Sequence, residues 1–192
     1  VQDCLEGIDS GFTSVMFDGS KLPISENIDI TARIVETAHA AGVSVEGEVG
    51  LVGYAEGASS ANTLPEEAAR YNNESGATAL AISVGNVHLK TEKTSGINFD
   101  ALKAIEEVTT LPLVLHGGSG IPVNIRKRLA RESSVSKFNI GTELRMAFGN
   151  ALRKSLTDNQ DSFDRIRLLS PTIDAVKSVT IEVIRALNGK PE

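Results

Sequence analysis

The sequence predicts an α/β fold in which short, buried, parallel strands alternate with amphipathic helices. Five times along the chain, a short apolar run is followed by a loop bearing Gly or Ser and then by a helical pattern. These runs are too short for typical helices and mostly apolar, as expected for parallel strands covered by helices. The predicted strands are residues 13–18, 43–48, 79–85, 113–116 and 136–140.

Five such units do not close an eight-stranded barrel, which typically needs about 250 residues, whereas this chain has 192. We therefore predict the last five units of a (β/α)8 TIM barrel, with three strands missing upstream. An open, doubly wound sheet is the alternative, because five parallel strands also complete a flavodoxin-like domain. The barrel is favoured because Val1, Leu5 and Ile8 repeat at helical spacing up to Gly11 with no residue to cap the helix start.

Capping signals predict where the next helices begin and end. Ser25 is a candidate N-cap for a helix that ends at Gly42. Thr63 and Glu66 form a candidate capping box for a helix that ends at Gly76.

Two more helices are expected after the last strand. Residues 143–156 have a helical pattern, and a final helix is expected from Ser170-Pro171 to Gly189. We see no linker, low-complexity tract or second domain, so residues 1–192 are expected to form a single domain, the C-terminal part of the barrel.

Composition excludes several classes of function. The formal charge of −6 argues against a nucleic-acid surface. No apolar stretch approaches the roughly 20 residues needed to span a membrane. Cys4 is the only cysteine, which rules out an internal disulfide and is compatible with the cytoplasm.

Two histidines, His88 and His116, lie at the carboxyl ends of two predicted strands. The carboxyl ends of parallel barrel strands meet on one rim, where the loops carry function. Imidazoles on that rim can share a Zn²⁺ ion, although either could be an ordinary histidine bonded to the backbone. The third histidine, His39, lies within a predicted helix, and we expect it to be structural.

The segment Gly-Gly-Ser-Gly at residues 117–120 predicts a phosphate-binding loop. Its glycines let the backbone approach an anion, Ser119 can donate a hydroxyl, and the helix after Pro122 directs its positive end nearby. Asn139 and Thr142 lie on either side of the end of the last predicted strand, and barrels often bind phosphate with the loops after their last two strands. A plain Gly-rich turn is the alternative.

The sequence allows more than one role for several charged side chains. Glu46 and Glu48 alternate on a strand and share one face, where buried carboxylates need a partner or a metal; a strand frayed into solvent is the alternative. Asp18 either orients a ligand or caps its loop. The run Arg126-Lys-Arg128 is typical of a solvated helix face.

Four motifs follow one another along the chain: Gly11-Phe-Thr-Ser-Val-Met-Phe-Asp-Gly-Ser, Val45-Glu-Gly-Glu-Val-Gly, Val84-Gly-Asn-Val-His and Leu113-Val-Leu-His-Gly-Gly-Ser-Gly. Over about residues 1–155 the chain resembles the class II, zinc-dependent ketose-bisphosphate aldolases. The resemblance implies a homodimeric barrel that cleaves fructose or tagatose 1,6-bisphosphate to dihydroxyacetone phosphate and glyceraldehyde 3-phosphate.

The resemblance also implies roles for individual residues. His88 and His116 match zinc ligands, and Glu48 matches a carboxylate near the metal. Glu56 matches a glutamate implicated in proton transfer. The positions that match substrate or phosphate contacts are Gly117, Ser119, Asn139 and Thr142.

The chain departs from the family pattern at three places. A stretch with a further zinc-ligand histidine and the acid/base aspartate is expected upstream of Val1, so these residues alone are expected to be inactive. Leu89 replaces a glycine whose carbonyl helps to bind a monovalent cation, which puts that cation in doubt. The loop Gly53-Tyr-Ala-Glu-Gly differs from the usual Gly-Gly-x-Glu-Asp. These departures leave two alternatives: a non-catalytic sugar-phosphate-binding or chaperoning subunit, and an aldolase for another phosphorylated ketose.

Overall fold

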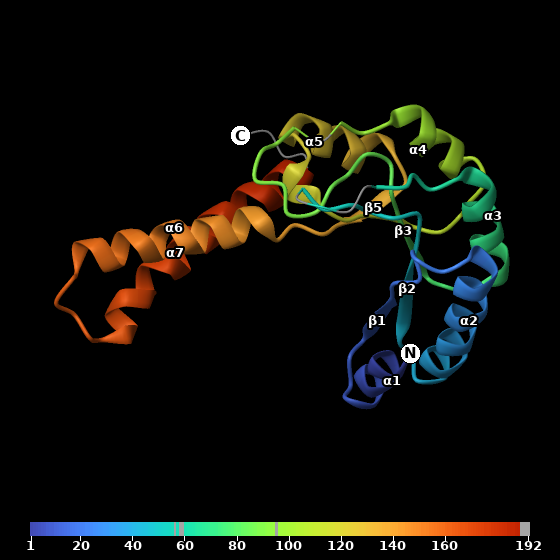
Figure 1. The fold of residues 1–192 in the computed structure, drawn as a ribbon, viewed down its shortest axis with the longest axis horizontal. Coiled ribbons are helices and arrows are strands. Elements are labelled where there is room, and N and C mark those ends of the chain that lie inside the picture. Colours follow the sequence, from blue (N-terminus) through green and yellow to red (C-terminus); the bar gives the residue numbers. More distant parts are fainter. Residues whose placement is uncertain (56, 58–59, 95, 189–192) are drawn as a thin grey trace.

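The computed structural model describes residues 1–55, 57, 60–94 and 96–188 as one parallel sheet with helices around it (Figure 1). The strands lie side by side in the order in which they follow along the chain. They are β1 (Ser14–Phe17), β2 (Ser44–Val49), β3 (Ala79–Ile82), β4 (Leu113–Leu115) and β5 (Val135–Phe138). The five predicted strands are confirmed and differ only at their ends.

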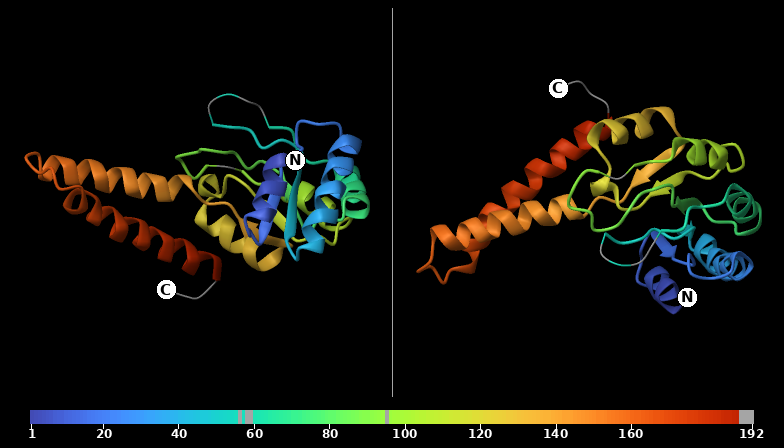
Figure 2. Two further views of the ribbon diagram at one scale, coloured as in Figure 1. Left: turned by 90° about the horizontal axis from the view of Figure 1, so that it is seen from below. Right: turned by 45° about the horizontal axis from the view of Figure 1, so that its top comes forward.

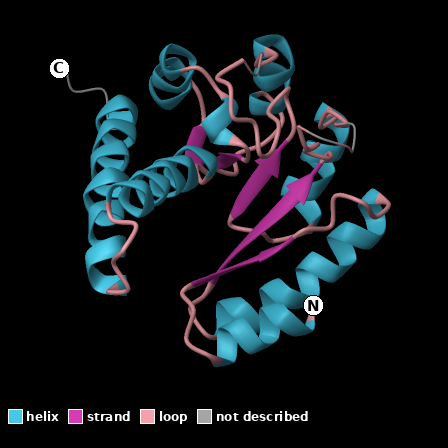
Figure 3. Cartoon of the chain, turned by 60° about the vertical axis from the view of Figure 1, so that its left-hand side comes forward, coloured by secondary structure: helices cyan, strands magenta, loops and turns pink. Residues whose placement is uncertain are grey.

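The sequential strand order decides between the two predicted architectures. Right-handed crossovers between successive neighbours place every connecting helix on the same face of the sheet, whereas a doubly wound sheet has helices on both faces. The helices lie along the outside of the curved sheet (Figure 3). The chain therefore forms five βα units of a (β/α)8 barrel. Its helices are α1 (Gln2–Asp9), α2 (Ile24–Ala40), α3 (Pro65–Glu74), α4 (Phe99–Glu106), α5 (Val123–Glu132), α6 (Thr142–Asp158) and α7 (Arg165–Asn188), with a 3₁₀ turn at Gly118–Gly120.

The two faces of the sheet carry different side chains. Leu80, Ile82, Leu113 and Leu115 are fully buried in the apolar core between the sheet and its helices. Residues between them in sequence face the other way, because side chains alternate along a strand. On that inner face, Glu48 is paired in register with Ala81, Ala81 with Val114, and Val114 with Lys137. The inner face therefore combines small residues with charged ones, and the site lies there.

Two capping predictions are wrong. Helix α2 begins at Ile24 after Pro23, so Ser25 lies inside the helix. Helix α3 begins at Pro65, whose fixed φ suits the first helical position. Thr63 instead joins two strand ends: its hydroxyl donates to the Val49 carbonyl oxygen at 2.5 Å and accepts from the Ser83 N–H at 2.8 Å.

Helices α6 and α7 form a hairpin that projects away from the sheet and returns beside α5 (Figures 1 and 2). The predicted start of the final helix is wrong, because α7 begins at Arg165 and contains Pro171. Asp164 starts the helix by accepting from the Ile166 N–H at 2.9 Å, and the Thr172 hydroxyl bonds the Leu169 carbonyl at 2.6 Å beside the proline. None of the helices in the described part of the chain is long and apolar enough to cross a membrane.

Candidate active site

A buried histidine lies between two carboxylates at the centre of the inner face. His116 follows β4, and its Nε2 is 3.0 Å from Glu46 Oε1 while its Nδ1 is 3.1 Å from Glu48 Oε2. All three residues are at least 94% buried. The alternative that this part of β2 is frayed into solvent is therefore excluded.

The two glutamates favour the protonated, positively charged form of the His116 ring. Burial alone would lower the pKa of His116, but its hydrogen bonds to Glu46 and Glu48 raise that pKa to about 9. Burial raises the pKa of Glu46, yet the hydrogen bonds from His116 and Lys137 bring it below its usual value. Lys137 Nζ lies 2.8 Å from Glu46 Oε2. The sequence singled out Glu46 but did not predict its contact with Lys137.

His88 lies beside this cluster and differs from His116 in charge. Its ring centroid is 5.7 Å from that of His116 and 5.0 Å from that of Tyr54. Burial and the nearby His116 lower the pKa of His88, so its imidazole is neutral at physiological pH. A neutral imidazole offers a nitrogen lone pair to a metal. His39, by contrast, is exposed in the last turn of α2 and does not line the cavity beside His88.

The loops carrying the two histidines pack directly against each other. Gly117 has φ +65°, and a Cβ at this position would lie 2.2 Å from the Val87 carbonyl oxygen. The buried Asn86 side chain donates to the carbonyls of Ile82 and His116 at 3.2 and 3.0 Å. Asn86 was missed in the sequence, because an amide that joins two loops leaves no local pattern.

Leu89 has a backbone conformation that suits a glycine. Its φ is +57°, and no other non-glycine residue in the described part of the chain has positive φ. The preceding His88 is fixed by its N–H to the Gly53 carbonyl at 2.8 Å, so the loop after β2 contacts this segment. Glu56, predicted to act in proton transfer, lies outside the described residues.

A cavity of about 420 Å³ brings the predicted phosphate residues together with His88. It lies where the loops after β4 and β5 meet, and the Gly118 N–H donates to the Asn139 carbonyl at 3.0 Å. The start of α6 also borders the cavity and offers its positive end. The lining residues are His88, Gly117, Ser119, Phe138, Asn139, Ile140, Gly141, Thr142 and Arg145.

Arg145 adds a cation that was not predicted. It lies three residues after Thr142 on α6, with Nη2 3.5 Å from the Thr142 hydroxyl. Residues three apart share a helix face, so this spacing could have revealed it. Asp18 does not reach the cavity; its carboxylate caps the next loop by accepting from the Ser20 N–H and hydroxyl at 3.0 and 2.6 Å.

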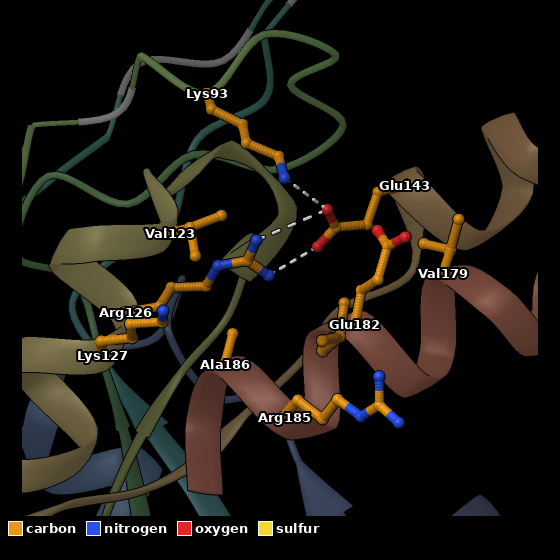
Figure 4. A pocket seen from close by; sticks show the side chains of 10 residues that line it. Lys93, Val123, Arg126, Lys127, Glu143, Val179, Glu182, Arg185 and Ala186 are labelled. Carbon is orange, nitrogen blue, oxygen red and sulfur yellow. Dashed lines mark hydrogen bonds and ion pairs between the residues drawn. The ribbon is translucent and has the colours of Figure 1, made fainter. Parts of the chain in front are cut away.

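Glu143 lies in the first turn of α6 and contacts α5, the loop after β3 and the turn after β4; Figure 4 shows its carboxylate with Arg126 and Lys93. Its backbone N–H donates to Ser119 Oγ at 3.2 Å, and its carboxylate pairs with Arg126 at 2.5 Å and Lys93 at 2.9 Å. Arg126 is only 1% exposed, so the prediction of a solvated face is wrong for this residue. The three side chains also line a second cavity of about 700 Å³ between α5 and α7.

The Glu143 ion pairs predict a pH-dependent stability. Burial raises the pKa of Glu143, but Arg126 and Lys93 lower it below its usual value of 4.5. A depressed folded-state pKa stabilises the protein fully above the unfolded-state value and less as pH falls through the folded-state pKa. Glu143→Gln is expected to lower the free energy of unfolding by about 1–3 kcal/mol at neutral pH, with the difference shrinking in acid below about pH 4.5.

Urea unfolding at several pH values measures this difference. Glu182→Gln is the matched control, because Glu182 lines the same cavity but makes no ion pair with the described residues. If Glu143→Gln lowers the free energy of unfolding by the same amount at neutral and at acidic pH, the ion pairs do not explain the loss.

The donor set is compatible with a zinc ion, although no three His, Cys, Asp or Glu side chains of the described residues already surround a common metal position. Zinc binds imidazole nitrogen and carboxylate oxygen, and His88, His116 and Glu48 supply both types. His88 is neutral, whereas both nitrogens of His116 contact carboxylates, so His116 must release one contact to bind a metal. The residues fit the ion once that contact opens.

Comparisons with known proteins point to one family. The family described as fructose-bisphosphate aldolase class-II matches residues 1–191. The chain is 38% identical to a fructose-bisphosphate aldolase of Geobacillus stearothermophilus and 39% identical to a 6-phospho-5-dehydro-2-deoxy-D-gluconate aldolase of Shouchella clausii, each over 96% of the chain. It spans 65% and 64% of the lengths of these relatives.

The fold is similar to that of a solved aldolase. The crystal structure of the YdjI aldolase from Escherichia coli superposes with a TM-score of 0.77 and 29% identity. The match covers 97% of this chain and 64% of that one. The likeness therefore takes in nearly the whole of this chain and about two thirds of the other.

Proposed function

Because the chain belongs to the class II fructose-bisphosphate aldolase family, we propose that the full-length protein is a zinc-dependent ketose-bisphosphate aldolase. It would cleave the C3–C4 bond of fructose or tagatose 1,6-bisphosphate to give dihydroxyacetone phosphate and glyceraldehyde 3-phosphate. One observation carries the proposal: His88 belongs both to the histidine-carboxylate cluster and to the lining of the smaller cavity. A metal-binding group and a phosphate-binding group are thus adjacent, as a phosphorylated ketose requires.

The metal would be held by His88 and His116, with Glu48 as a neighbouring carboxylate. When bound, the ion supplies a Lewis acid that polarises a ketone and stabilises enediolate charge. Glu46 Oε1 keeps His116 in place through a contact of 3.0 Å with its Nε2. Lys137 Nζ in turn holds Glu46 through a contact of 2.8 Å with its Oε2. Tyr54, packed against His88, shields one side of that ring from water.

The smaller cavity would hold a substrate phosphate. The Ser119 and Thr142 hydroxyls, the Asn139 side chain and backbone N–H groups at Gly117 can donate hydrogen bonds to phosphate oxygens. The start of α6 adds a favourable dipole, and Arg145 adds a full positive charge at the rim. Fixing the phosphate there places the carbon skeleton toward His88, because His88 lines the same cavity.

A second candidate is an aldolase for another phosphorylated ketose. The relative named for 6-phospho-5-dehydro-2-deoxy-D-gluconate is as similar to this chain as the fructose-bisphosphate aldolase is. That substrate carries a single phosphate and a carboxylate. A panel of both bisphosphates and this compound distinguishes the candidates by kcat/KM.

A homodimer belongs to the same proposal. Apolar side chains are exposed on the α6–α7 hairpin and offer a surface for a second copy. Phe163 is 98% exposed, Ile166 70% and Ile173 67%.

Chelation tests the metal dependence of the proposed activity. Thorough EDTA treatment of the full-length protein is expected to reduce triose-phosphate release from the preferred substrate to background, and added Zn²⁺ to restore it. A coupled assay for dihydroxyacetone phosphate measures both steps. Full activity after metal has been removed would overturn the proposal.

A further inference from the structure

We propose that the larger cavity, between α5 and α7, is a binding site for a small anion with an apolar body, and that Glu143 couples this site to the smaller cavity. The larger cavity has a volume of about 700 Å³, within the range of roughly 300–1,000 Å³ that is usual for small-molecule sites. The binding part of the inference is independent of the proposed function, whereas the coupling part rests on it.

The walls of the cavity come from four parts of the chain (Figure 4). They are α5, the first turn of α6, the C-terminal half of α7 and the loop after β3. The lining residues of α7 include positions 179, 183 and 186, whose helical spacing places them on one face. This face is apolar and half-buried, as is the α5 residue that lines the cavity with it: Val179, Val183, Ala186 and Val123. The apolar body of a ligand would gain contacts along these side chains and leave water.

The polar lining of the cavity is mainly positive. It contains four cations and two carboxylates, which are Lys93, Arg126, Lys127, Arg185, Glu143 and Glu182. The local charge is opposite in sign to the formal charge of −6 of the whole chain. An apolar wall combined with an excess of cations favours an anion over a neutral or cationic compound.

Part of this positive charge has no partner within the described part of the chain. Glu143 pairs with Arg126 and Lys93, whereas Lys127 and Arg185 make no ion pair with a described residue. Arg126 is buried, and its Nε has no hydrogen-bond partner among the described residues. A buried N–H without a partner is costly. The cavity therefore offers a ligand two free cations and one unused donor.

Glu143 belongs to both cavities. It lines the larger one, and its backbone N–H donates at 3.2 Å to Oγ of Ser119, which lines the smaller one. A bound anion would compete with the Glu143 carboxylate for Arg126 and Lys93. Loss of these ion pairs would loosen the first turn of α6, where Thr142 also lies. We therefore expect a ligand in the larger cavity to weaken the binding of substrate phosphate and to raise KM.

Two fluorescent probes test the site in the full-length protein. The first, 8-anilino-1-naphthalenesulfonate, joins an apolar body to a sulfonate, and its fluorescence rises when it leaves water. The second, N-phenyl-1-naphthylamine, has the same apolar body without the charge. We expect Lys127→Gln to lower the affinity for the sulfonate about 10-fold, because a charge-assisted contact is lost. The affinity for the neutral probe should not change.

Two further variants make the titration specific. Arg128→Gln is the matched control, because Arg128 does not line the cavity and pairs with Glu132 at 3.1 Å. It should bind both probes normally. Val183→Trp fills the cavity and should remove the binding of both, with thermal melting as the check on its fold. Equal affinity of Lys127→Gln and Arg128→Gln for the sulfonate, or undiminished binding in Val183→Trp, would overturn the inference.

Steady-state kinetics with the preferred phosphorylated ketose test the coupling. We expect the sulfonate probe to raise KM with little change in kcat. In Lys127→Gln, about 10-fold more probe should be needed for the same effect, while KM without probe stays unchanged because Lys127 does not line the smaller cavity. The same response in both proteins would mean that the probe acts elsewhere, and would overturn the coupling. If the protein has no aldolase activity, the proposed function fails, while the fluorescence titrations still decide the binding site.

Discussion

Replacing His116 by alanine is expected to lower kcat/KM for aldol cleavage by about 1,000-fold or more in the full-length protein. A metal acting as a Lewis acid contributes several kcal/mol to the transition state, and each 1.36 kcal/mol is a factor of ten in rate. His116→Ala removes a proposed metal ligand and leaves Glu46 and Glu48 facing each other in a buried site. Steady-state kinetics with the preferred bisphosphate measure the loss.

Two further variants make this prediction specific. His39→Ala should retain full activity, because His39 is exposed at the end of α2. His88→Ala should lose activity to a similar extent, and its fold is easier to keep because the ring of His88 is half-buried. A non-catalytic subunit would behave differently: its His116→Ala variant would still assemble and support its partner, with no turnover to lose.

Replacing Gly117 by alanine is expected to destabilise the protein by about 2–4 kcal/mol and to lower kcat/KM at least about 100-fold. A left-handed backbone costs a non-glycine residue roughly 1–2 kcal/mol. The new Cβ would also lie 2.2 Å from the Val87 carbonyl oxygen, so the two loops must separate. Small displacements of substrate-positioning groups can cost about 100-fold in rate.

Gly42→Ala is the matched control for this substitution. Gly42 has φ +70°, close to the +65° of Gly117, but a Cβ there would meet nothing within 4 Å. It should lose about 1–2 kcal/mol of stability and no activity. Equal effects of the two substitutions, measured by urea unfolding and by kinetics, would show that the contact between the loops is unimportant.

Much of the fold follows from local patterns in the sequence. Short, mostly apolar runs bounded by Gly, Ser or Asp indicate strands of a helix-covered parallel sheet, because their length and their flanking turn residues argue against helices. The runs that became β1 to β5 were all recognisable in this way. Helix starts were harder to predict from the sequence. Helix α2 begins directly after Pro23 and α3 begins at Pro65, whereas Ser25 and Thr63 had been predicted as the capping residues.

The site was predictable residue by residue but not as a network. His116, Glu46 and Glu48 were each expected to be important, and their rim location follows from barrel topology. Their mutual contacts span about 70 positions in the chain, and no local pattern encodes such pairings. For the same reason Arg126 was misjudged: its sequence neighbours are charged and solvated, while its own partner is Glu143 on another helix.

The central claim is that His88 and His116 hold one zinc ion, and the metal content of purified variants tests it most directly. Elemental analysis of the full-length protein should find one zinc per chain, and X-ray absorption should show imidazole nitrogen at about 2.0–2.1 Å. His88→Ala and His116→Ala should each lose the metal, whereas His39→Ala should keep it. Full zinc occupancy in both the His88 and His116 variants, or a fully active protein without metal, would contradict the account.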